Sequence, residues 1–243
     1  MKIAIKYTLV MSAVALLTAC GGGGSSSSSS SGNIGSNDSS SAPVASSLTF
    51  DVGSALRALT ISGQRSNFSI KASNGCLGSG SITSGPTTTN ATFEGKPALS
   101  SNSIFIVNYT NCVPATSSNT TTSYVDTNYL PLGTVGDKYI VYTGKFNLPS
   151  AIKVGDVGIF ADAQRYTDNT KTTPDGTAQI SYLVEADTAS TALITVATKV
   201  LGNSKLLEST QLTKYTINSS NVLSLVTLTI QYANGVSTVF TRI

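Results

Sequence analysis

Two acidic residues in the second half of this 243-residue chain are spaced so that their carboxyl groups could work together. Glu185 and Asp187 lie two positions apart in an alternating stretch, so on a β-strand both side chains project from the same face. Neighbouring carboxyl groups can differ in pKa and serve as the acid and the base of glycoside cleavage. Asp162, close in sequence to Arg165 and Tyr166, would join them if its strand ran alongside. The simpler interpretation is that these acids mark the solvent face of an amphipathic strand.

A group of tyrosines between residues 124 and 142 is the second candidate site, and its members are Tyr124, Tyr129, Tyr139 and Tyr142. Exposed phenol rings offer rigid contact area and a hydroxyl group, which suits a sugar or peptide partner. Tyrosine is also a favoured strand residue, so packing inside a sheet is the alternative. The chain contains no tryptophan, which weakens the sugar interpretation.

The chain contains no histidine, and this excludes several common kinds of chemistry. Without histidine there is no Ser-His-Asp or Cys-His catalytic unit, no imidazole ligand for a metal and no histidine pH switch. The sequence also lacks a G-x-S-x-G nucleophile elbow. We therefore expect no metal and no cofactor, and the composition favours a non-catalytic protein over an enzyme.

The amino-terminal segment has the features of an export signal. Lys2 and Lys6 precede a short apolar stretch that is too short to span a bilayer, which needs about 20 residues. The tetrapeptide Leu17-Thr18-Ala19-Cys20 closes it and resembles the lipobox of bacterial lipoproteins. This resemblance implies diacylation of the Cys20 sulfur, cleavage before Cys20 and acylation of the new amino terminus. The alternative is an ordinary secretory signal with a chance cysteine.

The residue after the lipobox and the acyl chains indicate where the protein resides. Gly21 stands where the usual inner-membrane retention signal of such lipoproteins has Asp, so the resemblance implies the outer membrane. Two or more acyl chains, at about 0.8 kcal/mol per buried methylene, hold a protein stably on a bilayer. The membrane is therefore an expected partner through the lipid anchor, although the sequence does not indicate which face.

Removal of the signal also changes the charge balance. The full chain has 15 basic and 12 acidic residues, and loss of Lys2 and Lys6 leaves 13 against 12 (15 − 2 = 13), a net side-chain charge of +1. A charge this small does not form the basic patch that nucleic-acid binding requires. The partners left open are an envelope glycan, a protein or an apolar ligand.

The remainder divides into a linker and one domain. Residues 20–47 contain the lipidated cysteine and a Gly/Ser-rich segment that cannot bury enough surface to fold, so we expect a flexible tether. Residues 48–243 are long enough for a single domain with a sizeable core. Cys76 and Cys112 form an even pair in an oxidising compartment, and a disulfide between them would stabilise the fold by about 3–4 kcal/mol.

Alternation of apolar and polar residues dominates the domain. Residues 178–187 and 192–200 alternate in this way, which is typical of half-buried antiparallel strands. Asn74-Gly75 and Asn234-Gly235 predict tight hairpins, and a two-residue turn at the latter would pair Ala233 with Val236 and Ile230 with Val239. Helical spacing appears once, in residues 51–60, with Asp51 as a possible cap and Gly63 as a stop.

Several stretches of the domain also resemble uncharacterised proteobacterial lipoproteins. They include Phe68-Ser69-Ile70 before Cys76, the Thr-Phe-Glu-Gly sequence at 92–95, residues 154–168 and residues 181–188. The resemblance implies no activity. We predict an all-β domain, a mainly antiparallel meander of long strands forming a curved sheet, a partial barrel or a sandwich. We expect a non-catalytic binding or envelope-structural module, with a carboxylate-type glycan hydrolase or a carrier of an apolar ligand as alternatives.

Overall fold

The computed structural model describes residues 43–144, 146 and 149–243. The predicted export signal, the lipobox with Cys20 and residues 21–42 of the predicted tether therefore lie outside the described residues. Two positions that the composition assigns to the tether contact the domain. The amide of Val44 donates to the carbonyl of Asp187 (3.3 Å), and the hydroxyl of Ser46 donates to the carbonyl of Ala189 (3.0 Å).

One helix precedes thirteen strands. The helix is α1 (Val52–Ser62), and the strands are β1 (Gln64–Ala72), β2 (Leu77–Ser84), β3 (Thr88–Phe93), β4 (Lys96–Tyr109), β5 (Thr116–Val125), β6 (Pro131–Val135), β7 (Tyr139–Thr143), β8 (Val157–Tyr166), β9 (Pro174–Thr188), β10 (Thr191–Leu201), β11 (Leu207–Asn218), β12 (Leu223–Tyr232) and β13 (Ser237–Arg242). Among the described residues no helix is both long enough and apolar enough to cross a bilayer.

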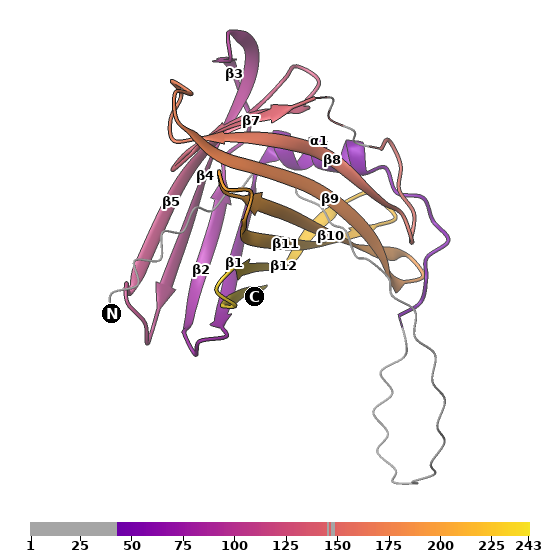
Figure 1. Cartoon of the computed structure of the whole chain (residues 1–243). Helices are drawn as coiled ribbons and strands as arrows, with labels where there is room; N and C mark the ends of the chain where they lie inside the picture. The colour runs from indigo at the N-terminus through magenta and orange to yellow at the C-terminus, as the bar shows by residue number, and fades with distance from the viewer. Residues whose placement is uncertain (1–42, 145, 147–148) are drawn as a thin grey trace.

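Twelve of the strands form a closed antiparallel barrel (Figure 1). From β4 to β13 each strand pairs with the next, β13 pairs with β1, β1 with β2, and the pairing of β2 with β4 completes the ring. β3 lies outside the ring because it pairs only with the first residues of β4. The predicted all-β meander with one short helix is confirmed. The curved sheet closes completely into a barrel.

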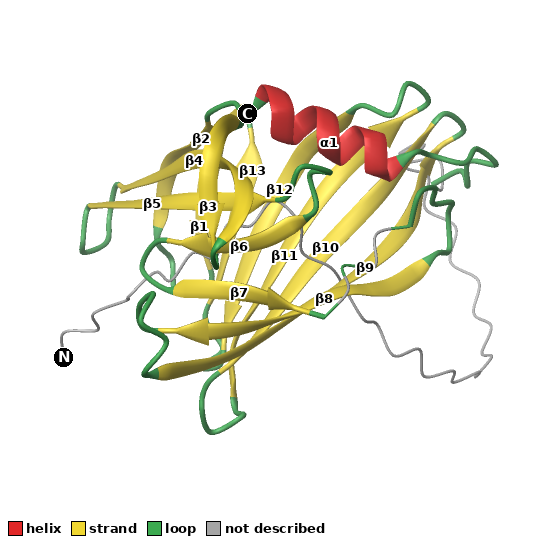
Figure 2. Cartoon of the chain, turned by 90° about the horizontal axis from the view of Figure 1, so that it is seen from above, coloured by secondary structure: helices red, strands yellow, loops and turns green. Residues whose placement is uncertain are grey.

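The helix forms where local signals predicted it. Asp51 accepts a hydrogen bond from the amide of Ser54 (2.8 Å), and Gly63 ends the helix with a positive φ of 71°. Hydrogen bonds from the hydroxyl and amide of Ser54 hold the pKa of Asp51 below its usual value, so the cap stays ionised at neutral pH. The amide of Asp51 also donates to the side chain of Asn221 (2.7 Å), which fixes α1 at one end of the barrel. Figure 2 shows α1 beside β12.

Both predicted hairpins form, but the turns at Asn74-Gly75 and Asn234-Gly235 each contain three loop residues where two were predicted. The amide of Tyr232 donates to the carbonyl of Val236 (2.8 Å), so the predicted pairing of Ala233 with Val236 is wrong. A two-residue type I′ turn needs positive φ at both central residues, and here only Gly235 (φ 85°) has it. The Asn234 side chain instead accepts a hydrogen bond from the amide of Val236 (3.0 Å), which stabilises the longer loop.

The longer loop shifts the register between β12 and β13 by one residue. Leu228 pairs with Phe240 and Ile230 with Thr238, not with Val239 as predicted. Since side chains alternate between faces, this shift points Phe240 into the barrel and leaves Val239 on the outer face. Phe240 is completely buried, so the observed register buries the larger apolar side chain.

The barrel interior contains the main apolar core. At its centre the rings of Phe68, Phe105 and Phe240 pack with centroid separations of 6.5, 6.3 and 5.3 Å, in edge-on or tilted arrangements. These rings come from β1, β4 and β13, and therefore lie at the seam where the first and last strands of the ring meet. Cys76 and Cys112, whose Cα atoms are 5.6 Å apart, lie at disulfide distance and connect β2 to the β4–β5 loop.

A network of charged side chains lies at the barrel end opposite α1. Arg165 on β8 is almost fully buried and donates to Asp175 (2.7 Å) on β9 and Glu208 (2.8 Å) on β11. Lys138 donates to the second oxygen of Asp175 (2.6 Å). Two positive and two negative side chains therefore balance, and they link β8, β9 and β11 to the residue that precedes β7.

Candidate functional site

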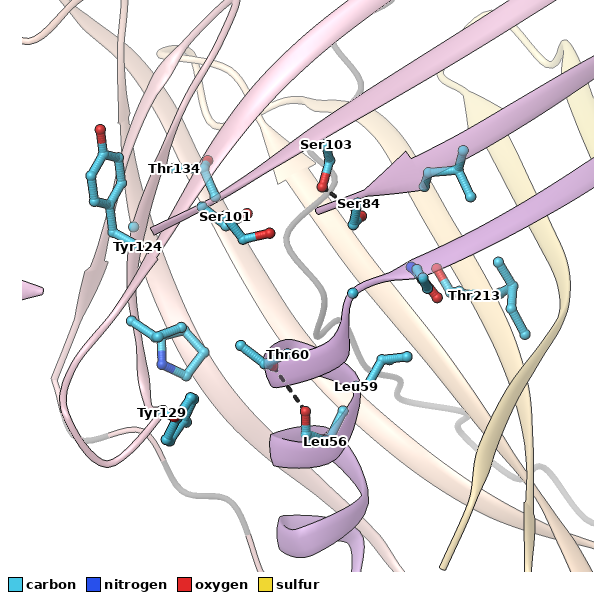
Figure 3. Close-up of a pocket in the computed structure, with 18 of the residues that line it drawn as sticks. Leu56, Leu59, Thr60, Ser84, Ser101, Ser103, Tyr124, Tyr129, Thr134 and Thr213 are labelled. Atoms are coloured by element: carbon cyan, nitrogen blue, oxygen red, sulfur yellow. Dashed lines mark hydrogen bonds between the residues drawn. The ribbon is translucent and has the colours of Figure 1, made fainter. Parts of the chain in front are cut away.

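A cavity lies inside the barrel beneath α1, and it is partly open to solvent. Its volume is about 90 Å³. Typical ligand pockets are several times larger, so a cavity of this size accepts a small molecule or one end of a longer one. It is lined by residues of α1, β1, β2, β4, β5, β6, β7, β11 and β12 and of the loops between them, which makes it part of the barrel interior (Figure 3).

One side of the cavity is apolar. Leu56 and Leu59 face it from α1, and Leu225 and Leu228 line it from β12. The sequence places the two leucines of α1 three positions apart, so both fall on the helix face that covers the barrel. Leu225 and Leu228 are at least 96% buried, so this wall is continuous with the main core.

Hydroxyl groups occupy another part of the wall. They belong to Ser84 of β2, Ser101 and Ser103 of β4, Ser123 of β5 and Thr134 of β6. Figure 3 shows Ser84, Ser101, Ser103 and Thr134 across the cavity from Leu56 and Leu59. The hydroxyls of Ser84 and Ser103 are 2.6 Å apart and share one hydrogen bond, while Ser101 donates to the carbonyl of Gly85 (2.6 Å).

The cavity is electrically neutral in the part of the chain that the structure describes. None of its described lining residues is acidic or basic. Burial raises the pKa of Tyr215, which lines the cavity from β11, to about 12, so its phenol stays uncharged at physiological pH. Such a wall suits the binding of an uncharged molecule.

Two contacts hold α1 across the cavity. The hydroxyl of Thr87, in the β2–β3 loop, donates to the carbonyl of Thr60. The guanidinium of the exposed Arg57 lies 4.8 Å from the ring centroid of Tyr129, a cation–π contact between α1 and the β5–β6 loop. Tyr129 lines the cavity with a left-handed backbone (φ 66°), a conformation that is costly for a bulky residue.

The structure separates Asp162 from the other two acids singled out in the sequence, Glu185 and Asp187, which both lie on β9. Asp162 on β8 pairs in register with Gln179, six residues before Glu185 on β9, which at strand spacing corresponds to roughly 20 Å. Glu185 forms an ion pair with Lys214 on β11 (3.1 Å), and Asp187 accepts a hydrogen bond from Thr191 (2.6 Å).

The surroundings of Glu185 also define its protonation. Burial raises the pKa of Glu185, but hydrogen bonds from Thr195 and Lys214 outweigh this effect and hold it below its usual value. Glu185 therefore stays ionised near neutral pH, and it alternates along β9 with Val184 of the core. Its side chain lies on the outer face of the barrel, not in the cavity.

The four tyrosines lie in three different surroundings. Tyr124 alternates with the cavity-lining Ser123, and its ring stacks outside the barrel on Phe93 of β3 (4.8 Å between centroids). Tyr139 stacks on the other face of Phe93 (5.4 Å) and donates to Glu94 (2.6 Å). The hydrogen bonds from Lys171 and Tyr139 lower the pKa of Glu94.

Tyr129 and Tyr142 line the cavity, and Tyr124 is also among its lining residues. Tyr142 packs edge-on against Phe146 (6.4 Å), which lines the cavity too. The group of four does not form one shared aromatic surface, although three of its members line the cavity.

The sequence analysis missed most cavity residues, although a signal for them exists. On β4 the inward positions read Ser101, Ser103, Phe105 and Val107, so they change from hydroxyl to apolar along the strand. β11 shows the same change from Gln211 and Thr213 to Tyr215 and Ile217. Inward polar residues on several strands indicate a polar space inside a barrel.

Neither a metal centre nor a family relationship identifies the site. In the described ranges no group of three or more His, Cys, Asp or Glu side chains is placed to hold a metal ion. Compared with family models, with curated protein sequences and with solved structures, the chain gives no match. The functional argument therefore rests on the cavity itself.

Proposed function

We propose that this protein is a lipid-anchored binding protein of the bacterial envelope, without catalytic activity, that holds an uncharged and largely apolar small ligand inside its barrel. The observation that carries the proposal is the neutral cavity beneath α1. Most of the barrel interior is filled by side chains of the core, whereas this region has space, a leucine wall and a set of hydroxyls. A barrel that served only as a structural scaffold would gain stability by filling that space.

The anchor forms a separate part of the proposal. The lipobox resemblance of Leu17-Thr18-Ala19-Cys20 supports acylation of Cys20 and attachment to the outer membrane. Cells given labelled palmitate should incorporate the label into the wild-type chain and not into Cys20→Ser. Equal labelling of both chains would show that Cys20 is not the acylated residue, and labelling of neither would remove the anchor from the proposal.

Ligand binding is tested with a probe that suits the cavity volume. The full chain carrying Cys20→Ser, which lacks acyl groups, would be titrated with toluene and followed by amide NMR. We expect shifts at Leu56, Leu59 and Leu228, and binding at least 10-fold weaker in Ser123→Trp because the indole fills the cavity. Native mass spectrometry of the same chain should detect a ligand retained from the cell.

A matched control separates cavity filling from general damage. Ser118 lies on the same strand, is exposed and points to the outer face, so Ser118→Trp should bind toluene as the parent does. If Ser123→Trp does not fold, Ser123→Leu provides a smaller obstruction. Absence of toluene binding in a folded parent chain would contradict the proposal and favour a purely structural role.

A further inference from the structure

The arrangement of the cavity wall indicates which kind of small molecule it takes. Resting on the proposed binding function, we propose that the ligand is a neutral amphiphile with a hydrogen-bonding oxygen, such as an alcohol or an ester, and that its oxygen faces Ser84 and Ser103 while its hydrocarbon part contacts the leucines of α1 and β12. The proposal distinguishes an uncharged ligand from a carboxylate of the same length.

The first step of the argument concerns the serine pair. The two hydroxyls are 2.6 Å apart, and each has one proton to donate. Only one of these protons is used between them, so the pair keeps one O–H group for a further acceptor. Ser103 is about 91% buried. At a buried position, an O–H group that donates to a ligand oxygen is more stable than an O–H group that has only hydrocarbon around it.

The second step concerns the opposite wall. Leu56, Leu59, Leu225 and Leu228 present only hydrocarbon to the cavity. Burial of a methylene against such a surface strengthens binding about 4-fold. A molecule with a chain at one end and an oxygen at the other therefore satisfies both walls at once, and the cavity volume limits the buried part to a few carbons.

The third step concerns charge. A carboxylate transferred into a space without a cation loses its hydration and gains no partner, which is unfavourable by several kcal/mol. The described lining contains no cation, and a basic side chain at this end, the exposed Arg57, stacks on the Tyr129 ring. Lys145, which precedes the cavity-lining Phe146 in the sequence, lies outside the described residues. Both basic residues enter the test for this reason.

The experiment compares 1-hexanol, hexanoate at pH 7.5 and toluene by NMR titration of the full Cys20→Ser chain. Hexanol and hexanoate have the same length and differ in the charge of the polar end. We expect hexanol to bind at least 10-fold more tightly than hexanoate. Ser84→Ala/Ser103→Ala should bind hexanol about 3- to 10-fold more weakly, because one hydrogen bond to the ligand is lost. Its affinity for toluene, which accepts no such bond, should stay within 2-fold of the parent's.

The control variant removes two hydroxyls from the outer face of the two strands that flank β4. Ser79 on β2 and Ser118 on β5 are exposed, so Ser79→Ala/Ser118→Ala should leave all three affinities unchanged. Alanine is slightly smaller than serine, so neither Ser84→Ala/Ser103→Ala nor Ser79→Ala/Ser118→Ala should disturb the packing. Both variants should therefore retain the parent's amide spectrum outside the cavity.

The remaining outcomes separate this inference from the proposed function. Equal binding of all three probes would overturn the neutral-oxygen inference and leave the apolar binding site intact. Tight hexanoate binding that is lost in Arg57→Gln or Lys145→Gln would also overturn it, by placing an anionic head beside a cation. Failure of every probe to bind a folded chain would overturn both proposals.

Discussion

Phe240→Ala is expected to lower the free energy of unfolding by about 3–5 kcal/mol, an effect as large as any that we predict for a single substitution. Phe240 is completely buried and contacts the rings of Phe68 and Phe105 at the seam of the barrel. Truncation removes the burial of a whole ring and leaves a cavity between strands from the two ends of the domain. Chemical denaturation with urea would measure the change.

The neighbouring residue provides the control for this prediction. Val239 lies next to Phe240 on β13 but points to the outer face, where it is partly exposed. Val239→Ala should cost about 1 kcal/mol or less, because most of its side chain remains near solvent in both states. Equal losses for Phe240→Ala and Val239→Ala would show that the ring cluster does not hold the seam.

Arg165→Met is expected to cost about 3–5 kcal/mol for a different reason. Methionine matches much of the volume of arginine but cannot donate to Asp175 and Glu208, so it leaves two carboxylates with only Lys138 to balance them. The expected loss corresponds to a decrease in melting temperature of roughly 10 °C for a domain of this size. Thermal unfolding followed by circular dichroism would measure it.

Two further variants test whether charge is the cause. Arg65 on β1 is exposed, so Arg65→Met should change the melting temperature little. The double substitution Asp175→Asn/Glu208→Gln in the Arg165→Met background removes the uncompensated negative charges and should restore part of the stability. An Arg165→Met chain as stable as the parent would show that the network contributes nothing to folding.

The parts of the fold that could be predicted from the sequence depend on neighbouring residues. Asp51 and Gly63 mark the ends of α1 through bonds made within the helix and its flanks, and the prediction is confirmed. Alternation in residues 178–187 likewise predicts the strand and the face that it buries. Such signals are contained in short windows, so no knowledge of the remaining chain is needed.

The failures have specific physical causes. At Asn234-Gly235 two turn types compete, and the asparagine side chain selects the longer loop by accepting the amide of Val236. The dipeptide alone does not settle that competition, yet it determines whether Val239 or Phe240 points inward. The longer loop points Phe240 inward, where it packs on Phe68 and Phe105. Both of these residues are distant from Phe240 in sequence.

The cavity depends on contacts between distant segments in the same way. Each strand indicates its inward face, but the meeting of Ser103 on β4 with Leu225 and Leu228 on β12 follows only from closure of the ring. The acids at 162, 185 and 187 illustrate the converse. Their spacing in sequence suggested proximity, whereas the register between β8 and β9 separates Asp162 from Glu185.

The pairing of β1 with β13 also determines when the domain can complete its folding. Residues 68–72 must find residues 238–242, and this contact spans almost the whole domain. A chain that emerges amino terminus first, from a ribosome or a translocation pore, presents β1 long before its partner exists. Until β13 arrives, β1 and β12 each keep an unpaired edge that is prone to aggregation. The barrel therefore folds after its synthesis is essentially finished, slowly for its size, and its unclosed form is the state that a chaperone would have to protect.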